Sequence, residues 1–501
     1  MAITNGALLN SVPASMQQTL STNYIDFNQD MGWAQQYLPD LMEKEAEVFG
    51  PRTISGFLSQ VGAEESMTAD QVIWSEQGRL HLSYKGNVAS TNAGADTGAG
   101  GTTPRITIES DIDETAGFTA ANHGIRVNDT IIVSNSDGIF KCLVTVVNGA
   151  NIDVAPYGAT TLAANTTSNG TTILVYGSEF GKGDSYRAAT GTTNTTDSRG
   201  ANEPTFTTFS NKPIIMKDYY EVSGSDTARI GWVEVASEEG QSGYLWYLKA
   251  EADTRARFTD YIEMAMLEGE LNVAGSVADG ATILPGSTAG AGNVGTEGLF
   301  AAIESRGNIT TGVTGVSASV DLAEFDAILA EFDKQGAIEE NMLFVNRSTS
   351  LAIDDMLASM NSYGSGGTSY GVFDNEEDMA LNLGFSGFRR GSYDFYKSDF
   401  RYLNDLATRG GINAANSANA IRGVMIPAGT SSVYDQTVGA SMKRPFLHVR
   451  YRASQTDDRR MKTWVTGSVG AATSALDAMQ LHFLTERCLV TQGANNFMLM
   501  K

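Results

Sequence analysis

The stretch that decides the fold runs from residue 204 to residue 272. It begins with PTFTTFSNKPIIMKDYYEVSG (204–224), whose composition and alternation are typical of β-strands. After a short link it continues as QSGYLWYLKAEADTRARFTDYIEMAMLEGELN (241–272), which predicts an uninterrupted helix of about 32 residues. Such a helix would be roughly 48 Å long, far beyond the three-turn average of globular proteins. The sequence therefore predicts strands followed by an unusually long helix.

The predicted helix is apolar on more than one side. One stripe follows the spacing of a helical face and consists of Leu245, Leu248, Ala252 and Ala256. A largely different arc contains Tyr247, Phe258, Tyr261 and Ala265. We therefore expect cover from two directions, by the helix's own domain and by a neighbouring copy of the chain. A long core helix in a large monomeric enzyme is the alternative interpretation.

Composition narrows the functional class. The 501 residues include 58 acidic against 34 basic side chains, a net charge of −24, so neutralising a nucleic-acid backbone is not expected to be the main task. Cys142 and Cys488 lack the spacing of a disulfide framework, zinc site or redox motif, which favours a reducing cytoplasm. The opening residues lack a signal-peptide pattern, and no run of eighteen apolar residues occurs. We expect neither export nor membrane insertion.

The N-terminal half divides by composition. Residues 1–63 are predicted to form an arm with two short helices, and residues 71–89 alternate as strand material whose expected partner is 204–223. Between these strands, residues 91–180 have a different composition and are predicted to form an inserted β-barrel. Its strand candidates are TPRITIES, IRVNDTIIVS, GIFKCLVTVVNG, ANIDVAPYG and TTILVYG, separated by Asn-Asp, Asp-Gly and Asn-Gly turns.

The C-terminal half predicts alternating helices and strands. A short helix is expected over 298–306, and a second begins at a cap, Asp321, and ends at Gly336. Its apolar face would contain Leu322, Phe325, Ile328, Leu329 and Phe332. A buried strand over 342–345 and a helix from 346 to 360 follow. FLHVRYRA (446–453) and MKTWVTGSV (461–469) are predicted to form a hairpin, before a last apolar segment over 475–491.

This order of segments resembles the major capsid proteins of tailed phages with the Hong Kong 97-type coat fold. The best matching stretches are FSNKPIIMKDYYEVSG with the following helix, and FDKQGAIEENMLFVNRSTSLAIDDML (332–357). The N-terminal MAITNGALLNSVPASMQQTL and the overall layout are most similar to coat proteins of crAss-like phages.

The resemblance implies an α+β fold with an extension loop, a spine helix, and peripheral and axial domains, carrying the inserted small β-barrel. The implied ranges are an N-terminal arm at 1–63, extension-loop strands at 64–90 and 181–224, the inserted barrel at 91–180, a peripheral domain with the spine helix at 225–295, an axial domain at 296–425, and a peripheral-domain hairpin with the C-terminal segment at 426–501.

The resemblance also implies self-assembly through hexamers and pentamers into an icosahedral head, with the extension loop lying over a neighbouring subunit. The head would enclose double-stranded DNA without sequence-specific contact. The expected partners are further copies of the chain together with portal, scaffold, and head-decoration or auxiliary capsid proteins. The expected location is the virion capsid, assembled in the host cytoplasm without a membrane.

Candidate subunit-interface residues lie in the extension-loop strands and at a mixed-charge turn near the C-terminus. They are Trp74, Tyr84, Phe206, Phe209, Ile214, Tyr219, Tyr220, Arg459 and Arg460. Two other functions remain open from the sequence: another phage assembly component such as a tail tube or sheath subunit, and a β-rich adhesin.

No segment predicts catalysis. The four histidines show no metal-ligand spacing, and GSEFGKG (177–183) has three rather than four residues between its phosphate-loop glycines. The acidic cluster Glu109, Asp111, Asp113 and Glu114 lacks the spacing of a calcium loop. We therefore expect no enzymatic activity, no cofactor and no metal.

Overall fold

The computed structural model describes residues 63–78, 80–90, 103–114, 117–162, 165–182, 206–225, 234–236, 242–279, 290, 292–335, 338–360, 387–428, 430–435, 440–468 and 472–501. They belong to two compact units, Met1–Ile73 with Ser210–Lys501 (the main unit) and Trp74–Phe209 (the barrel unit). The helices predicted in the N-terminal arm and the helix stop predicted at Gly336 lie outside the described residues.

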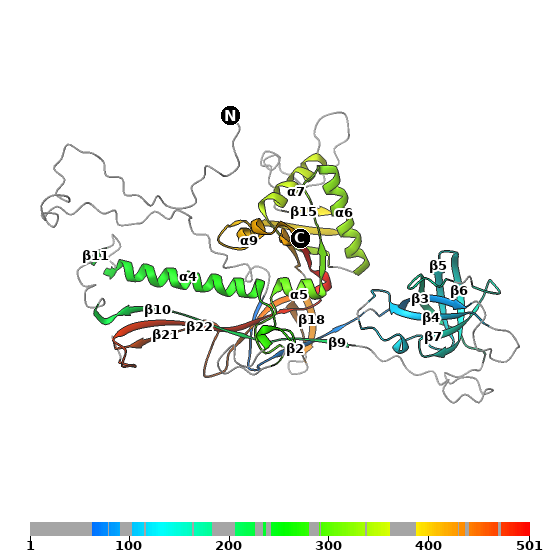
Figure 1. Cartoon of the computed structure of the whole chain (residues 1–501), viewed down its shortest axis with the longest axis horizontal. Coiled ribbons are helices and arrows are strands. Elements are labelled where there is room, and N and C mark those ends of the chain that lie inside the picture. The colour runs from blue at the N-terminus through cyan, green and yellow to red at the C-terminus, as the bar shows by residue number, and fades with distance from the viewer. Residues whose placement is uncertain are drawn as a thin grey trace. The chain divides into compact units, whose positions relative to one another are not determined.

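The main unit contains a mixed five-stranded sheet in which one long strand pairs with three others (Figure 1). Strand β22 (Ala478–Thr491) pairs antiparallel along one edge with β10 (Ile214–Ser223). Its other edge is shared by two strands: β20 (Leu447–Arg452) pairs with its C-terminal half and β21 (Lys462–Gly467) with its N-terminal half. Strand β1 (Ala63–Met67) adds in parallel to β20.

The predicted hairpin of 446–453 and 461–469 is therefore wrong in its pairing. Strands β20 and β21 exist, but each forms its ladder with β22 and not with the other. The 14-residue length of β22 explains this, because one long strand offers enough backbone for two short partners end to end.

Helix α4 (Leu245–Glu268) runs along this sheet (Figure 1). It has 24 residues, which makes it about 36 Å long. The predicted 32-residue helix is too long at both ends. Residues 242–244 form strand β12 (Ser242–Tyr244), which pairs with β11 (Glu234–Ala236). At the other end a Cβ on Gly269 would lie 2.6 Å from the carbonyl oxygen of Thr296, so close backbone packing occupies the position after the helix.

The buried face of α4 differs from the predicted stripes. Its side chains repeat every four residues at Thr254, Phe258, Ile262 and Met266. Phe258 meets Phe483 of β22 with ring centroids 5.9 Å apart. Ala252 and Ala256 are exposed, so the first predicted stripe is wrong at these two positions. Alanine is small and favours a helix on any face, so its spacing says little about which face is buried. The side chains of Leu245, Tyr247 and Leu248 lie outside the described residues.

A second sheet of six strands lies in the same unit. Its order is β13 (Asn308–Thr310), β23 (Met498–Met500), β17 (Gly423–Pro427), β14 (Glu340–Val345), β16 (Tyr393–Asp399) and β15 (Gly387–Arg390). The predicted helix, strand and helix are confirmed as α6 (Ala318–Gln335), β14 and α7 (Arg347–Met360). Short elements complete the unit: α5 (Leu299–Arg306), α8 (Arg401–Asn404), α9 (Arg409–Ala415), β18 (Thr430–Asp435) and β19 (Ala440–Pro445).

Packing around the second sheet follows the predicted apolar faces. Phe325, Ile328 and Phe332 of α6 are buried, and Leu322 and Leu329 pack against the same cluster. Helix α6 begins three residues before Asp321, so Asp321 is not its cap. Its carboxylate instead accepts a hydrogen bond from the Gly315 N–H at 2.8 Å.

One apolar cluster joins the two sheets of the main unit. It contains Met266 and Leu267 from the end of α4, Val449 and Leu489 from the first sheet, and Val424 and Leu499 from the second, among others. The long helix and both sheets therefore share a continuous core.

The barrel unit contains a closed barrel of six strands. Their order is β3 (Ser83–Ser90), β4 (Arg105–Asp111), β7 (Asn151–Pro156), β6 (Gly138–Asn148), β5 (Asp129–Asn135) and β8 (Thr171–Ser178). The five predicted strands are confirmed. The sixth, β3, lies in the range predicted for the extension loop, which is a correction. Gly86 fits this place, since a Cβ there would lie 2.1 Å from the carbonyl oxygen of Thr107 on β4.

Outside the barrel, β2 (Val72–Gln77) pairs with β9 (Phe206–Asn211) as a two-stranded ribbon. The predicted pairing of 71–89 with 204–223 therefore holds only for these two strands. Pro213 separates β9 from β10, because proline cannot donate a ladder hydrogen bond. Just before it, the Asn211 side chain donates to the carbonyl oxygens of Leu489 at 2.6 Å and Glu297 at 2.9 Å, and thereby fixes the start of β10 beside β22.

The two cysteines provide separate reporters of the two units. Burial raises the pKa of Cys142, in the barrel, and of Cys488, in β22, to about 12. At mildly alkaline pH the folded protein should hold roughly a thousandfold less thiolate than the unfolded chain. We expect both thiols to resist iodoacetamide until urea unfolds their own unit, as measured by mass spectrometry of pulse-labelled peptides. Alkylation in the folded protein at the rate of a free cysteine would contradict this.

The role of β3 gives a second prediction. A fragment of residues 80–182 should fold as an isolated barrel with a cooperative thermal transition. A fragment of residues 102–182 should not, since it lacks the buried Tyr84 and Val88 and leaves open edges on β4 and β8. Near-ultraviolet circular dichroism distinguishes the two. Equal cooperativity in both fragments would show that β3 is dispensable.

Candidate interaction surface

The main sheet leaves one face partly open. Alternate residues of β10 point away from α4, and among them Ile215 is 52% and Tyr219 56% exposed. We call this side of β10, β22 and β21 the open face. In the paired register it also carries Trp464, Thr466, Gln480 and His482. Exposed aromatic and branched side chains on a sheet are typical of a surface that binds another protein.

Three aromatic rings form a row across the open face. His482 of β22 stacks on Trp464 of β21, with centroids 5.1 Å apart and planes 17° apart. On its other side it stacks on Tyr219 of β10, at 6.0 Å and 30°. The Thr466 hydroxyl lies 2.7 Å from Nε2 of His482. These contacts fix the rings before any partner arrives, which lowers the entropy cost of binding.

A polar row lies next to the rings. The Gln480 side-chain amide donates to the Glu221 carboxylate at 2.7 Å, and the Thr466 hydroxyl donates to the Gln480 oxygen at 3.3 Å. The open face therefore combines an apolar strip with satisfied polar groups beside it, which is the usual composition of a protein interface.

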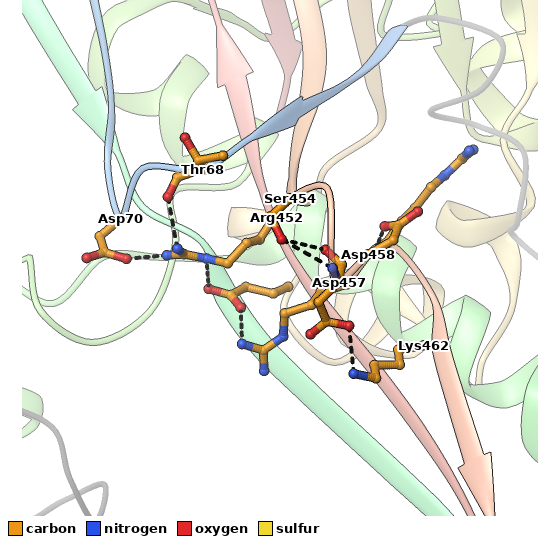
Figure 2. A network of polar contacts seen from close by, with 10 residues as sticks. Thr68, Asp70, Arg452, Ser454, Asp457, Asp458 and Lys462 are labelled. Atoms are coloured by element: carbon orange, nitrogen blue, oxygen red, sulfur yellow. Dashed lines mark hydrogen bonds and ion pairs between the residues drawn. The ribbon is translucent and has the colours of Figure 1, made fainter.

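At the end of this face, a buried carboxylate is held by two arginines. Glu486 is 4% exposed, and it pairs with Nε of Arg452 at 2.7 Å and with Nη1 of Arg459 at 2.8 Å. Figure 2 shows the side chain of Arg452 extending toward Thr68 and Asp70. Arg452 donates to the carbonyl oxygen of Thr68 at 3.0 Å and pairs with Asp70. The hydrogen bond with Asp70 is the main cause that raises the pKa of Arg452.

A second arginine cluster lies on the side of the sheet that faces α4. Arg487 donates to the carbonyl oxygen of Arg460 at 2.7 Å and pairs with Glu64 at 3.3 Å. Burial lowers the pKa of Arg487, and Glu64 opposes this shift. Arg460 also pairs with Glu64, and its guanidinium lies 5.7 Å from the centre of the Tyr451 ring.

The turn between β20 and β21 is ordered by its own polar contacts (Figure 2). The Ser454 N–H donates to the carbonyl oxygen of Asp457 at 2.8 Å, and Lys462 pairs with the Asp457 carboxylate at 2.6 Å. The Asp458 carboxylate accepts from the Arg460 N–H at 2.8 Å. The mixed charges of this turn therefore serve the chain's own fold, and they hold Arg459 and Arg460 in place.

The predicted interface residues fall into two groups. In the main unit, Tyr219 lies on the open face, whereas Ile214 and Tyr220 are half-buried on the side facing α4, where burial raises the pKa of Tyr220. Arg459 and Arg460 are engaged in the ion pairs described above. The five predicted residues of the main unit therefore do not lie on one face of the sheet.

The remaining predicted residues lie in the barrel unit. Trp74 is buried in the ribbon, with its ring 6.2 Å from that of Phe209. Tyr84 belongs to the barrel core, where its hydroxyl accepts from the Gly124 N–H at 2.8 Å and burial raises its pKa. Phe206 lies in β9, and its side chain is outside the described residues.

Sequence reasoning missed the residues that complete the open face. Ile215, Trp464 and His482 lie far apart in the chain, and only the register of β10, β22 and β21 brings the last two beside Tyr219. The sequence does show alternating residue types within each strand. This alternation predicts which side chains share a face of the strand, but it does not predict which strand lies beside it.

Among the described residues, no three histidine, cysteine, aspartate or glutamate side chains come together as a metal site. No helix in the described ranges combines the length and apolarity needed to cross a membrane.

Comparison with known proteins finds similarity to solved structures alone. No family model matches the chain, and no curated protein matches it. One similar solved structure is entitled "Capsid structure of the Cyanophage P-SCSP1u", with 7% identity, a TM-score of 0.37, and coverage of 97% of this chain and 98% of that chain. Another comes from Microbacterium phage Oxtober96, with 8% identity, a TM-score of 0.35, and coverage of 94% and 97%.

A third similar structure is the "Asymmetric unit of bacteriophage PhiM1 mature capsid", with 9% identity and a TM-score of 0.30 over 62% of this chain and 78% of that chain. At these identities and TM-scores, the likenesses carry no functional assignment for this chain.

The buried carboxylate of Glu486 gives a prediction for stability. Glu486→Gln should destabilise the main unit by about 1–3 kcal/mol, since it leaves two guanidinium groups without their shared anion. Urea unfolding monitored at Cys488 measures the change. Glu221→Gln is the matched control, because Glu221 is an exposed carboxylate on the same sheet. Equal stability of the two variants would mean that the ion pairs contribute nothing net.

Proposed function

We propose that this chain is the major capsid protein of a tailed double-stranded DNA phage. In this proposal it assembles through hexamers and pentamers into an icosahedral head with a Hong Kong 97-type coat fold, most like that of crAss-like phages. The chain acts as a structural protein and not as an enzyme. Its partners are further copies of itself, with portal, scaffold and head-decoration or auxiliary proteins.

The observation that carries the proposal is the open face of the main sheet. Helix α4 covers one side of β10 and β22, while the other side exposes Ile215 and Tyr219 beside a fixed row of rings. A solvent-facing sheet side is normally polar. An exposed apolar strip on long strands is instead suited to burial against another subunit, and a shell repeats that contact in every copy.

The composition is consistent with enclosing DNA and not reading it. The net charge of −24 disfavours extensive phosphate contacts, and arginines near the main sheet are used within the chain. The ribbon of β2 and β9 supplies strands for an extension loop, which we propose lies over a neighbouring subunit. An isolated two-stranded ribbon is marginally stable in water, so such a contact would stabilise it.

Negative-stain electron microscopy of the purified chain, with and without a co-expressed scaffold, tests the proposal. Closed shells are the expected product. Tubes would favour a tail tube or sheath subunit, and discrete monomers under every salt and scaffold condition would contradict a shell protein.

The open face provides a specific variant. Ile215→Ser combined with Tyr219→Ser should lower the yield of shells at least about tenfold, because central apolar and aromatic contacts dominate interface energy. The urea midpoint of the subunit should change little, since both side chains are exposed. Ile412→Ser combined with Tyr396→Ser is the control, as these residues of the same two types are similarly exposed and lie elsewhere in the main unit. Shell yield equal to the wild type would remove the open face from the assembly interface.

A further inference from the structure

Strand β1 is unusual for a strand in a parallel pairing. Its sequence is AEESM, and it pairs in parallel with β20 at one edge of the main sheet. Parallel strands are normally apolar and buried on both faces. In β1, Glu64, Glu65 and Met67 are half-buried and Ser66 is exposed, so apolar burial contributes little to its attachment.

Charge pairs take the place of apolar packing. Glu65 pairs with Arg450 at 2.8 Å on one side of the sheet, and Glu64 pairs with Arg487 and Arg460 on the other. Successive residues of a strand point to opposite faces, so the two carboxylates fasten β1 from both sides.

The link that follows β1 is fastened in the same way. Arg452 holds the carbonyl oxygen of Thr68 and pairs with Asp70 (Figure 2). The backbone adds the Ala453 N–H, which donates to the carbonyl oxygen of Met67 at 3.0 Å. Three carboxylates within residues 64–70 therefore meet arginines from β20, β22 and the turn after β20.

We infer that β1 is an electrostatic latch: it is a separable edge strand that charge pairs hold on β20, and it fixes residues 63–70 to the main sheet. Most of these pairs are partly exposed, so dissolved salt screens them. The pairing of β10 with β22 differs, because the Met216, Phe258 and Phe483 cluster packs beneath it. Salt should therefore release β1 while the rest of the sheet stays folded. The latch belongs to a single subunit and does not depend on the proposed shell.

Hydrogen exchange measured by mass spectrometry on the full-length chain tests the latch. Raising NaCl from about 0.1 M to about 1 M shortens the screening length from roughly 10 Å to 3 Å. Backbone amides of residues 63–67 should then exchange about tenfold faster, since each screened pair contributes a factor of a few. Amides of β10 and β22 should keep their rates. Unchanged protection of β1, or a parallel loss of protection in β10 and β22, would overturn the inference.

Charge variants provide a second readout. Glu64→Gln with Glu65→Gln should give fast exchange in β1 already at low salt, with little further response to NaCl. The control is Glu251→Gln with Glu331→Gln, which removes the same charge from ion pairs within α4 and α6. It should behave like the wild type.

A charge swap covers the case in which the glutamine variant fails to fold. Arg450→Glu alone should release β1, and adding Glu65→Arg should restore its protection at low salt by re-forming the pair with reversed charges. Failure of the swap to recover any protection, together with a salt-insensitive wild type, would assign β1 to backbone pairing alone.

Discussion

The two edges of β22 are the constraint on which the main sheet depends. A strand can pair along two edges only, and β22 fills one with β10 and divides the other between β20 and β21. This arrangement determines which residues meet across the sheet. It places Phe483 beneath α4 and turns His482 to the other side, where Tyr219 and Trp464 flank it. The covered side and the open face are thus consequences of one register.

Apolar contacts stabilise one part of this sheet, and ionic contacts stabilise another. Under α4, aromatic and aliphatic side chains exclude water and continue into the core shared with the second sheet. Toward β1, arginines and carboxylates replace them, and a buried charge requires its partner much more strictly than an apolar side chain does. The same sheet therefore has an apolar part whose packing tolerates salt and an edge whose attachment depends on charge.

Local patterns predicted the elements well and their partners poorly. Helix α6 and strand β14 were predictable because their apolar residues follow a period within one segment. The barrel strands were predictable for the same reason, together with their turn residues. By contrast, no pattern within residues 83–90 distinguishes a strand of an extension loop from a strand of a barrel. No pattern within residues 461–469 indicates that this strand pairs with β22. Pairing is decided by contacts between distant segments, which one sequence does not reveal.

The residues of the open face were also hard to predict, because they come from strands that are far apart in the sequence. Tyr219 was recognisable as an exposed aromatic residue of an alternating strand, yet its neighbours on the open face come from residues 464 and 482. Trp74 and Tyr84 have the same residue character in sequence, but the fold buries both. What separates an interface aromatic from a core aromatic is therefore the layer that covers it. In this chain α4 covers one side of the main sheet, whereas Tyr219 on the other side stays 56% exposed beside the stacked rings of His482 and Trp464.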